Sequence, residues 1–412
     1  MSNLRKYKFS DLYDISSGIS SKPEQAGHGF PFLSFSAVFN NHFLPTLLPD
    51  LMDTSEKERK TYSIKKGDIF LTRTSETLDE LALSSVAIAD IQNATYSGFL
   101  KRLRPKQSDV TYAKFMAFYL RSKLFRKTMK NNAIMTLRAS FNEQIFSYLD
   151  LLLPEFDAQK NIGDLLFLIN EKIELNNKIN AELEAIAKLI YDYWFVQFDF
   201  PDANGKPYKS SGGKMVYNEG LKREIPEGWE VKKLSDIATC IMGQSPKGET
   251  YNTKGVGTPL LNGPADYKNG ALFGRTYTTS PTRLCEKDDL VLCIRATIGN
   301  LVYSEKQFCL GRGVAAVRPN DKKNSELIYY QVLQEIERFK RQATGSIIKG
   351  ISKDDLSESS CIFPCPNLLE RFHAHIRPIF EKQRLGKQES IRLTELRDWL
   401  LPMLMNGQVT VS

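Results

Sequence analysis

The feature that most constrains the fold is the stretch from Asp157 to Phe200, which has the pattern of one long helix ending in an aromatic cluster. No glycine or proline interrupts it after Gly163. Apolar side chains recur at intervals of three and four residues, which places them on one face of a helix. These side chains are Ile162, Leu165, Leu166, Ile169, Ile173, Ile179, Leu183, Ile186 and Ile190. At about 1.5 Å per residue the helix would span about 45 to 55 Å, which predicts a spacer that packs against a second helix.

Length and composition indicate a folded protein of more than one domain. At 412 residues the chain exceeds what a single core normally fills. Its 42% hydrophobic and 25% charged residues are ordinary for a globular protein and exclude disordered and collagen-like classes. The net charge of +8 permits a polyanionic partner but does not by itself require one.

Targeting signals and cysteine usage favour the cytoplasm. The first residues lack the apolar segment of a signal peptide, and no run of about 18 apolar residues occurs. The six cysteines all lie in the second half and contain no CxxC pair, which predicts reduced and mostly buried thiols. They are Cys240, Cys285, Cys293, Cys309, Cys361 and Cys365.

The second half of the chain repeats the order of the first at a shift of roughly 210 to 220 residues, which indicates a duplicated domain. Residues 66–71, KGDIFL, match 287–292, KDDLVL, and Leu103-Arg104-Pro105 matches Val317-Arg318-Pro319. The predicted order is a mixed α/β domain over 1–156, a long helix over 157–200, a connector loop over 201–223, a second mixed domain over 224–366, and a second long helix with a tail over 367–412.

Several shorter elements follow from hydrophobic periodicity. In the first domain the strands are predicted at Ile69–Leu71, Val86–Ala89, Phe99–Leu103 and Leu149–Leu153, and one basic amphipathic helix at Thr111–Lys130. The second half is predicted to contain helices at Ser325–Gln342 and Leu368–Met403. The last of these is the natural partner of the first long helix. An antiparallel pair would bury both apolar stripes and hold two mixed α/β domains apart in a pseudo-two-fold arrangement.

Motifs for catalysis are missing from the sequence. It contains no GxGxxG after a strand, no GxxxxGK[ST], no GxSxG and no zinc-protease pattern. Cys361 and Cys365 with His373 and His375 form the best metal candidate, but the cysteines fall in a predicted buried strand, so no metal site is predicted.

Binding of duplex DNA is better supported, because two copies of one domain suit the two half-sites of a target. Lysine and arginine contact phosphates, while arginine, asparagine, glutamine and hydroxyl side chains read base edges. The candidates are Arg73, Thr74, Lys101, Arg102, Arg104 and Arg138 in the first copy, and Gln244, Lys247, Asn262, Arg275, Tyr277, Arg283, Arg295, Thr297, Arg312 and Lys349 in the second. Each could instead be a solvated or locally paired side chain. Two rival hypotheses are a scaffold whose twin domains bind protein, and a nuclease, which would need an acidic metal cluster that the sequence lacks.

The aromatic cluster that ends the long helix has two interpretations. It either caps the helix against the adjacent domain or presents a docking surface for another subunit, since aromatic, charge-poor patches are typical of interface cores. The docking candidates are Tyr191, Tyr193, Trp194, Phe195 and Phe198, together with Trp399 near the end of the chain.

Several motifs carry a family resemblance. They are 175–180, LNNKIN, 189–201, LIYDYWFVQFDFP, 205–215, GKPYKSSGGKM, 225–229, IPEGW, and 396–402, LRDWLLP, with 406–409, NGQV. The chain resembles the specificity subunits of type I restriction-modification systems, the first four motifs their central conserved region and the last two their distal one.

The resemblance implies a subunit with two target-recognition domains joined by an antiparallel pair of helices, whose length sets the spacer of a bipartite DNA target. It implies no catalysis and no cofactor on this chain. Two modification subunits would supply adenine methylation with S-adenosylmethionine, and restriction subunits would add ATP- and Mg-dependent translocation and cleavage.

Overall fold

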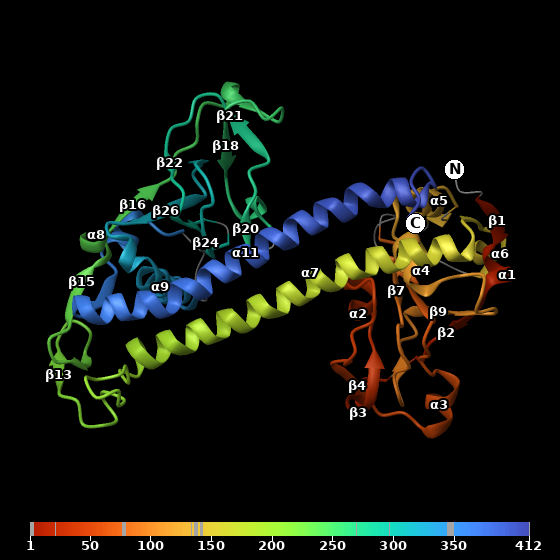
Figure 1. Ribbon diagram of the computed structural model, residues 1–412, viewed down its shortest axis with the longest axis horizontal. Coiled ribbons are helices and arrows are strands. Elements are labelled where there is room, and N and C mark those ends of the chain that lie inside the picture. The colour runs from red at the N-terminus through yellow and green to blue at the C-terminus, as the bar shows by residue number, and fades with distance from the viewer. Residues whose placement is uncertain are drawn as a thin grey trace. The chain divides into compact units, whose positions relative to one another are not determined.

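The computed structural model describes the chain except residues 1–3, 21, 76–79, 133, 136–138, 141–142, 269, 296, 344–349 and 412. Contacts divide it into two compact units (Figure 1). The first unit is Met1–Glu174 with Ser390–Ser412, and the second is Leu175–Glu389. Each unit contains one mixed α/β domain and a part of each of two long helices, α7 (Phe156–Tyr191) and α11 (Pro366–Met405).

The first unit contains two principal sheets, of which one has the order β2-β9-β5-β7 and the other β4-β3-β8. Its strands are β1 (Arg5–Lys8), β2 (Tyr13–Ser17), β3 (Ala26–Leu33), β4 (Asp50–Met52), β5 (Ile69–Thr72), β6 (Thr74–Ser75), β7 (Ser84–Val86), β8 (Thr95–Tyr96), β9 (Leu100–Pro105), β10 (Ile134–Met135), β11 (Ala139–Ser140) and β12 (Asp150–Leu153). Its shorter helices are α1 (Phe9–Leu12), η1 (Pro23–Gln25), α2 (Phe35–Asn40), α3 (Glu56–Thr61), α4 (Ala113–Tyr119), α5 (Lys123–Asn132) and α6 (Glu143–Tyr148).

The second unit repeats this plan with a sheet of order β16-β26-β23-β24 and a larger one of order β17-β21-β18-β25-β22. Its strands are β13 (Met215–Asn218), β14 (Arg223–Pro226), β15 (Glu230–Lys233), β16 (Ala238–Met242), β17 (Tyr251–Asn252), β18 (Thr258–Leu261), β19 (Tyr267–Lys268), β20 (Ala271–Leu272), β21 (Thr276–Thr278), β22 (Leu284–Cys285), β23 (Leu290–Cys293), β24 (Gly299–Tyr303), β25 (Phe308–Leu310), β26 (Val314–Pro319) and β27 (Ser360–Phe363). Its shorter helices are η2 (Asp192–Val196), α8 (Leu234–Ile237), η3 (Gly248–Thr250), η4 (Pro264–Asp266), η5 (Lys322–Asn324), α9 (Ser325–Ala343) and α10 (Lys353–Ser357).

The duplication recurs in the strand pairing. In the first unit β9 lies between β2 and β5, and in the second β26 lies between β16 and β23, all antiparallel. The register agrees as well, because Ile69 pairs with Leu103 and Leu290 pairs with Val317. The two matched sequence segments therefore occupy equivalent places in equivalent sheets.

Two short elements differ from the sequence-based prediction. The strand predicted at Val86–Ala89 is β7, three residues that end at Val86, because the next residue, Ala87, pairs with the turn at Gly67 and Asp68 instead of extending the ladder. The single helix predicted at Thr111–Lys130 is two helices, α4 and α5, separated by a turn. Arg121 lies in that turn and donates hydrogen bonds to four backbone carbonyls, those of Val38, Phe39, Asn41 and Ser84.

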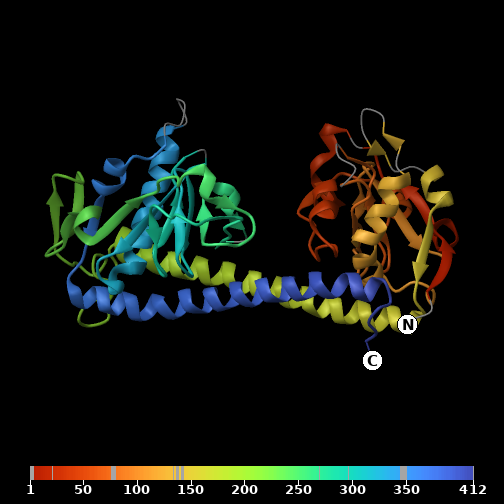
Figure 2. The ribbon, with the colours of Figure 1, turned by 90° about the horizontal axis from the view of Figure 1, so that it is seen from above.

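In each unit the sheets lie on one side of α7 and α11 (Figure 2). In the first unit Ile162 and Leu166 of α7 share a core with Leu404 and Met405 of α11. In the second unit Ala187 and Tyr191 of α7 share one with Phe372 and Ile376 of α11, among others. Within each unit, therefore, parts of both long helices belong to one core.

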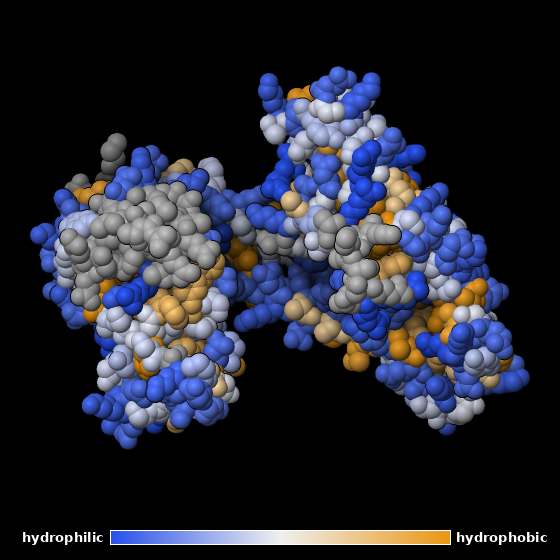
Figure 3. All heavy atoms as spheres, turned by 180° about the vertical axis from the view of Figure 1, so that it is seen from behind, coloured by the Kyte–Doolittle hydropathy of each residue, from blue (hydrophilic) through white to orange (hydrophobic). Residues whose placement is uncertain are grey.

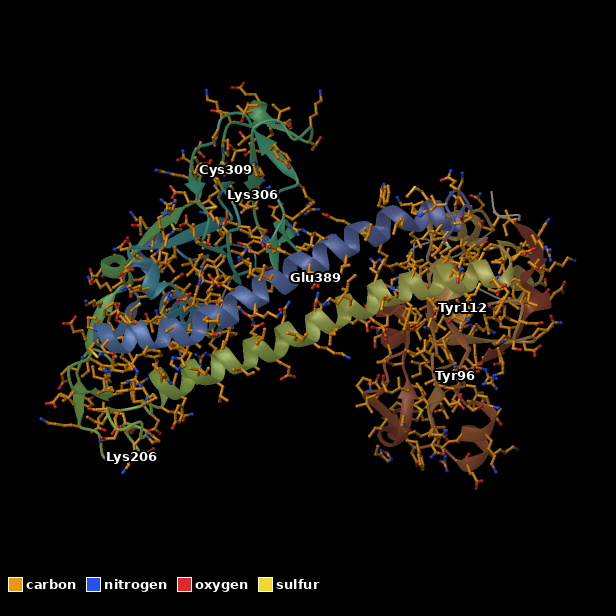
Figure 4. The ribbon with its side chains drawn as sticks, viewed as in Figure 1. Tyr96, Tyr112, Lys206, Lys306, Cys309 and Glu389 are labelled. Carbon is orange, nitrogen blue, oxygen red and sulfur yellow. The ribbon has the colours of Figure 1, made fainter. Side chains whose placement is uncertain are left out.

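Polar contacts fix each mixed domain to a long helix. In the first unit Asp164 of α7 accepts hydrogen bonds of 2.8 Å from Tyr112, labelled in Figure 4, and from Lys114. Burial opposes ionisation of this carboxyl, but the two hydrogen bonds outweigh it and lower the pKa of Asp164. In the second unit the buried carboxylate of Glu326, in the first turn of α9, contacts His373 at 2.6 Å and Arg377 at 3.4 Å on α11.

Two asparagines of α7, Asn176 and Asn180, lie in its buried face within the second unit. Asn176 donates to Glu389 of α11 at 2.8 Å (Glu389 is labelled in Figure 4), and Gln383 of α11 donates to the carbonyl of Asn180 at 3.1 Å. A Cβ at Gly386 would lie 2.9 Å from the Asn180 amide oxygen, so α11 passes close to the side chain of Asn180. These polar contacts fix the register of the two helices in this unit, whereas Asn177 is exposed.

Among the described residues, no helix is both long enough and apolar enough to cross a membrane.

Candidate nucleic-acid interface

The ends of three strands, β16, β18 and β23, meet at the turn between β25 and β26 of the second unit, residues 311–313. Gly311 donates a backbone hydrogen bond of 2.7 Å to Leu261 at the end of β18. Ile294, which follows β23, donates to Gly313, and Gln244, which follows β16, donates to Leu310. The loops that leave β16, β18 and β23 are therefore held around this one turn, the β26 turn.

Close backbone approach requires glycine on both sides of the β26 turn. A Cβ at Gly311 would lie 2.3 Å from the Asn262 side-chain oxygen, and one at Gly313 would lie 2.0 Å from the Asn262 carbonyl oxygen. A Cβ at Gly243 would lie 2.1 Å from the carbonyl oxygen of Gly311. Only glycine lets these backbones approach so closely.

Five predicted DNA-contacting side chains surround the β26 turn. All five are exposed, and none forms a side-chain hydrogen bond or ion pair with a residue that the structure describes. They are Gln244, Asn262, Arg283, Arg295 and Arg312. Three arginines and two amides free at one end of a domain can bind phosphates and base edges, because these side chains carry the required donors and acceptors.

Asp266 holds one of these loops in shape. Its buried carboxylate accepts from the backbone amides of Asn262 at 2.6 Å and Gly263 at 3.2 Å. Arg275 donates to the Ala265 carbonyl at 2.7 Å and lies 4.0 Å from Asp266. Arg275 therefore braces the loop, although its side chain stays exposed.

The remaining candidates of the second unit lie apart from the β26 turn or outside the described residues. Lys247 is the exposed N-cap of η3, and Tyr277 is half-buried on β21. The arm that contains β17, β18 and β21 is largely hydrophilic (Figure 3). Thr297 is exposed in the loop that contains Arg295, and Lys349 lies outside the described residues.

The first unit has the same construction at residues 97–99, the β9 turn. Ser97 donates to the carbonyl of Leu33 at 3.0 Å, the counterpart of the bond from Gly311 to Leu261. Ile19 donates to Tyr96, which is labelled in Figure 4, as Gln244 donates to Leu310. The backbone amide of Arg73 donates to the carbonyl of Phe99 at 2.9 Å, as the backbone amide of Ile294 donates to the carbonyl of Gly313 at 3.0 Å. The β9 turn is therefore the counterpart of the β26 turn.

Of the predicted contacts in the first unit, Arg73 alone lies free and exposed within the described residues. Lys101 and Arg102 on β9 are buried instead. Lys101 donates to the hydroxyl of Ser17 at 2.7 Å, and Arg102 donates to the carbonyl of Ser63 at 2.8 Å. The placement of Thr74's side chain and the whole of Arg138 lie outside the described residues.

Arg104 is held in a bidentate ion pair with the buried carboxylate of Asp68, at 2.6 and 2.7 Å. The second unit has the same pair at Arg318 and Asp289, at 2.8 and 2.9 Å. These hydrogen bonds raise the pKa of both guanidinium groups. The structure therefore assigns Lys101, Arg102 and Arg104 internal partners, and a DNA interface built from exposed side chains does not include them.

The helix predicted over 157–200 ends as α7 at Tyr191 and continues only as the short π-helix η2 to Val196, so most of the aromatic cluster lies beyond α7. This cluster is mostly internal. Four of the docking candidates, Tyr191, Trp194, Phe195 and Phe198, are buried in one core of the second unit. Their contacts include Phe195 with Phe372 at 4.7 Å between ring centroids and Phe198 with Trp229 at 5.5 Å. The two other candidates differ, since Tyr193 is partly exposed and Trp399 is largely exposed.

A second apolar face of α7 remains uncovered in the second unit. Its members are 37% to 66% exposed and follow one another at the alternating spacing of a coiled-coil seam, with Glu182 at the one polar position. This exposed seam consists of Leu175, Ile179, Ile186 and Leu189 of α7 and continues through Tyr193 and Val196 of η2. The sequence pattern predicts that Ile179 and Ile186 belong to the stripe that packs on the second helix. This prediction is wrong, because the buried face of α7 runs through Asn176, Asn180 and Ala187.

The possible metal ligands have separate environments. Cys361 is buried on β27, Cys365 is exposed, and His375 contacts the backbone carbonyl of Arg371 at 2.7 Å. Within the described ranges there is no group of three or more residues placed to hold a metal ion.

The protein is therefore built from two copies of one mixed α/β domain. In each copy the ends of several strands are hydrogen-bonded to one turn, the β9 turn in the first unit and the β26 turn in the second. Residues 1–185 and 226–376 match the family model described as type I restriction modification DNA specificity domain. Because these matches span more than half of the chain, the chain belongs to this family.

Curated relatives and a solved structure agree with the family match. The chain is 25% identical over 97% of its length to a putative type I restriction enzyme MjaX specificity subunit of Methanocaldococcus jannaschii, of which 91% is covered. It is also 25% identical over 99% of its length to the type I restriction enzyme HindI specificity subunit of Haemophilus influenzae, of which 100% is covered. The fold is similar to a crystal structure of the type I restriction-modification S subunit of M. genitalium, with a TM-score of 0.63, 16% identity and coverage of 98% and 96%.

Proposed function

We propose that this chain is the DNA sequence-specificity subunit of a type I restriction-modification complex, with one half-site of a bipartite target read by each mixed domain. The observation that carries the proposal is the duplicated turn, around which Gln244, Asn262, Arg283, Arg295 and Arg312 gather in the second unit. Family membership and the names of the relatives support it. In this proposal the chain is not catalytic and acts in the cytoplasm, and S-adenosylmethionine, ATP and Mg belong to partner subunits.

The side chains at the β26 turn suit DNA for a physical reason. Ordinary surface arginines are often paired with neighbouring carboxylates, as Arg338 is with Glu335 at 2.6 Å. Arg283, Arg295 and Arg312 have no such partner among described residues, so phosphates or guanine edges can bind them without first breaking an ion pair.

Selection from random duplexes tests the function directly. The full chain with its modification subunits, incubated with a random duplex library at moderate salt, is expected to enrich one bipartite motif. Its affinity is expected to fall steeply as salt rises, because bound lysine and arginine release counterions from the DNA. No enriched motif, or affinity that does not change with salt, would favour the alternative of a twin-domain protein-binding scaffold.

Arg312 provides the residue-level test of the interface. Arg312→Ala is expected to weaken binding of the enriched duplex by about 1–3 kcal/mol and to relax preference at one position of a single half-site, because a base contact specifies and a phosphate contact does not. Lys206→Ala is the matched control, since Lys206 is exposed in the connector loop of the same unit (Figure 4). Equal effects of the two substitutions would remove Arg312 from the interface.

The spacing of the two half-sites belongs to the same proposal. We assign it to an antiparallel pairing of α7 and α11 that holds the two domains in a pseudo-two-fold arrangement, as the family resemblance implies. The enriched motif reports this directly. One fixed spacer length between the half-sites supports a rigid helical ruler, and a range of spacer lengths would refute it.

The exposed seam of α7 is proposed to dock the modification subunits. Its alternating three-and-four spacing fits another α-helix, because knobs from a partner helix insert between side chains at this repeat. Tyr193, the one predicted docking residue on the seam, lies near its end, and restriction subunits would join the assembled complex. Trp399 belongs to the other unit and is not part of this seam.

A charge placed on the seam tests the docking. Leu189→Asp is expected to reduce copurification of the modification subunit at least about tenfold, because a buried unpaired carboxylate at an interface is costly. Ala181→Asp adds the same charge at an exposed position of the same helix away from the seam, and it should leave the complex intact. Retention of the partner by Leu189→Asp would place the docking surface elsewhere.

A further inference from the structure

Phe99 differs from the other large apolar residues near the β9 turn, because its side chain is 66% exposed while its neighbours Tyr96 and Leu100 are fully buried. Its backbone is fixed on both sides. The backbone amide of Phe99 donates to the hydroxyl of Ser97 at 3.2 Å. The backbone carbonyl of Phe99 accepts from the backbone amide of Arg73 at 2.9 Å. A rigid backbone therefore presents an apolar ring to solvent beside Arg73, whose side chain has no hydrogen-bond or ion-pair partner among the described residues.

Comparison of the two copies shows that the fold does not require a side chain at this position. The bond from Arg73 to Phe99 has its counterpart between Ile294 and Gly313, so Phe99 is equivalent to Gly313. Leu100 donates to Ser97 as Val314 donates to Gly311, which confirms this alignment of the turns. Glycine serves the turn in one copy, so the phenyl ring in the other is not there to stabilise the fold.

Each turn carries one large exposed side chain, but the chemistry differs. The β26 turn presents Arg312, a hydrogen-bond donor, with Arg295 nearby in the chain segment after β23. The β9 turn presents Phe99, which forms no hydrogen bond through its side chain, with Arg73 after β5. An isolated exposed phenylalanine on a surface needs no explanation. Here the ring stands at the position around which the proposed DNA contacts of the other copy gather.

We propose that Phe99 is a specificity-determining residue that makes an apolar contact with a base in the half-site bound by the first unit. This inference rests on the proposed DNA-binding function and deepens it. Two features of DNA offer the required chemistry: the C5-methyl group of thymine, and the face of a base at a step opened by an inserted ring. Arg73 binds the adjacent phosphate or base edge and positions the ring. The two half-sites are thus read by different chemistry at equivalent turns.

Binding measurements with the enriched duplex test the inference, using the full chain with its modification subunits. Phe99→Ala is expected to weaken binding about tenfold, whereas Phe99→Trp, which keeps an aromatic ring, should bind within a few-fold of the parent. Leu152→Ala is the matched control, because Leu152 is another exposed apolar residue of this unit, on β12 in a separate pair of strands. Parent-like binding by Phe99→Ala would overturn the inference.

Changes in the DNA identify which feature is read and leave the protein unaltered. If Phe99 contacts a methyl group, replacing one thymine of that half-site by uracil weakens DNA binding by the parent protein. The same replacement does not further weaken DNA binding by Phe99→Ala. If the ring inserts between bases, the fluorescence of 2-aminopurine placed at one step of the half-site rises when the parent protein binds. It does not rise when Phe99→Ala binds. Loss of affinity in Phe99→Ala with neither signature would also overturn the inference. Failure of the parent to enrich any motif would instead remove the proposed function, and this inference with it.

Discussion

Replacing Asp68 with alanine is expected to destabilise the first unit by about 3–5 kcal/mol, the usual cost of removing one partner of a buried ion pair. The Asp68 carboxylate is fully buried and accepts two hydrogen bonds from Arg104 and one of 2.8 Å from the Lys65 amide. Its removal leaves the guanidinium group without a counter-charge and the turn before β5 without its acceptor. Urea unfolding of the full chain, followed by circular dichroism, measures the lost free energy of unfolding as a transition at a lower urea concentration.

A double variant separates the charge effect from packing. Asp68→Ala with Arg104→Met removes both charges, so it should recover part of the stability lost in the single variant. Asp289→Ala, the same change in the second copy, should destabilise the second unit by less, because Arg318 keeps a second carboxylate partner, Glu286, at 3.2 Å. A loss below about 1 kcal/mol in both single variants would mean that water reaches the pair and screens it.

Repetition in the sequence predicted the duplicated architecture, because strand order follows from matched segments whose spacing is preserved. The segment that contains Asp68 was recognisable from the match of residues 66–71 with 287–292. Its partner across the sheet was not recognised. The pairing of Asp68 with Arg104 depends on β5 lying beside β9, a contact between segments far apart in the chain, and no local pattern reports it.

The internal placement of Lys101 and Arg102 illustrates a limit of charge patterns. In a strand with one solvated face, charged residues mark that face. On β9 the residues Leu100 to Leu103 are all buried, so both faces are covered, and the charged residues lie inside with hydrogen-bond partners of their own. Their residue types are those that bind phosphate, and only the fold distinguishes the two uses.

The candidate site could be predicted as a set of residue types but not as a place. Gln244, Asn262, Arg283, Arg295 and Arg312 come from separate loops that meet only through backbone hydrogen bonds to the β26 turn. Phe99 was missed because it begins the strand predicted at Phe99–Leu103, and a phenylalanine in a strand is ordinarily part of the core, whereas β9 begins only at Leu100. The signal that identifies it is its equivalence to Gly313, which requires the hydrogen-bonded register of both copies.

The two apolar faces of α7 could not be separated from the sequence either. Both faces repeat at helical spacing, so Ile179 and Ile186 fit a stripe with Ile162 and Ile169 as well as they fit a seam of their own. Asn176 and Asn180 resembled interruptions in a hydrophobic stripe. In the structure they are buried members of the face that meets α11, while the seam through Ile179 and Ile186 is exposed.

The aromatic end of α7 provides the second large expected effect, because it distinguishes a capping role from a docking role. Phe372→Ala is expected to destabilise the second unit by about 3–5 kcal/mol, since a fully buried phenylalanine leaves a cavity that its neighbours only partly fill. The ring of Phe372, 1% exposed, lies 4.7 Å from that of Phe195 and 5.7 Å from that of Trp194. Thermal and urea unfolding of the full chain measure the loss.

Tyr193→Ala, at the residue directly before Trp194 of the same cluster, is the matched control. Tyr193 lies on the exposed seam, so its truncation should change stability by no more than about 0.5 kcal/mol while weakening copurification of the modification subunit. The opposite pattern, with Phe372→Ala stable but defective in assembly, would make the buried cluster the docking surface. Phe372 on α11 packs inside the buried aromatic cluster, whereas Tyr193 on η2 is partly exposed. This pair of variants therefore assigns capping to the buried rings and docking to the seam, or reverses the assignment.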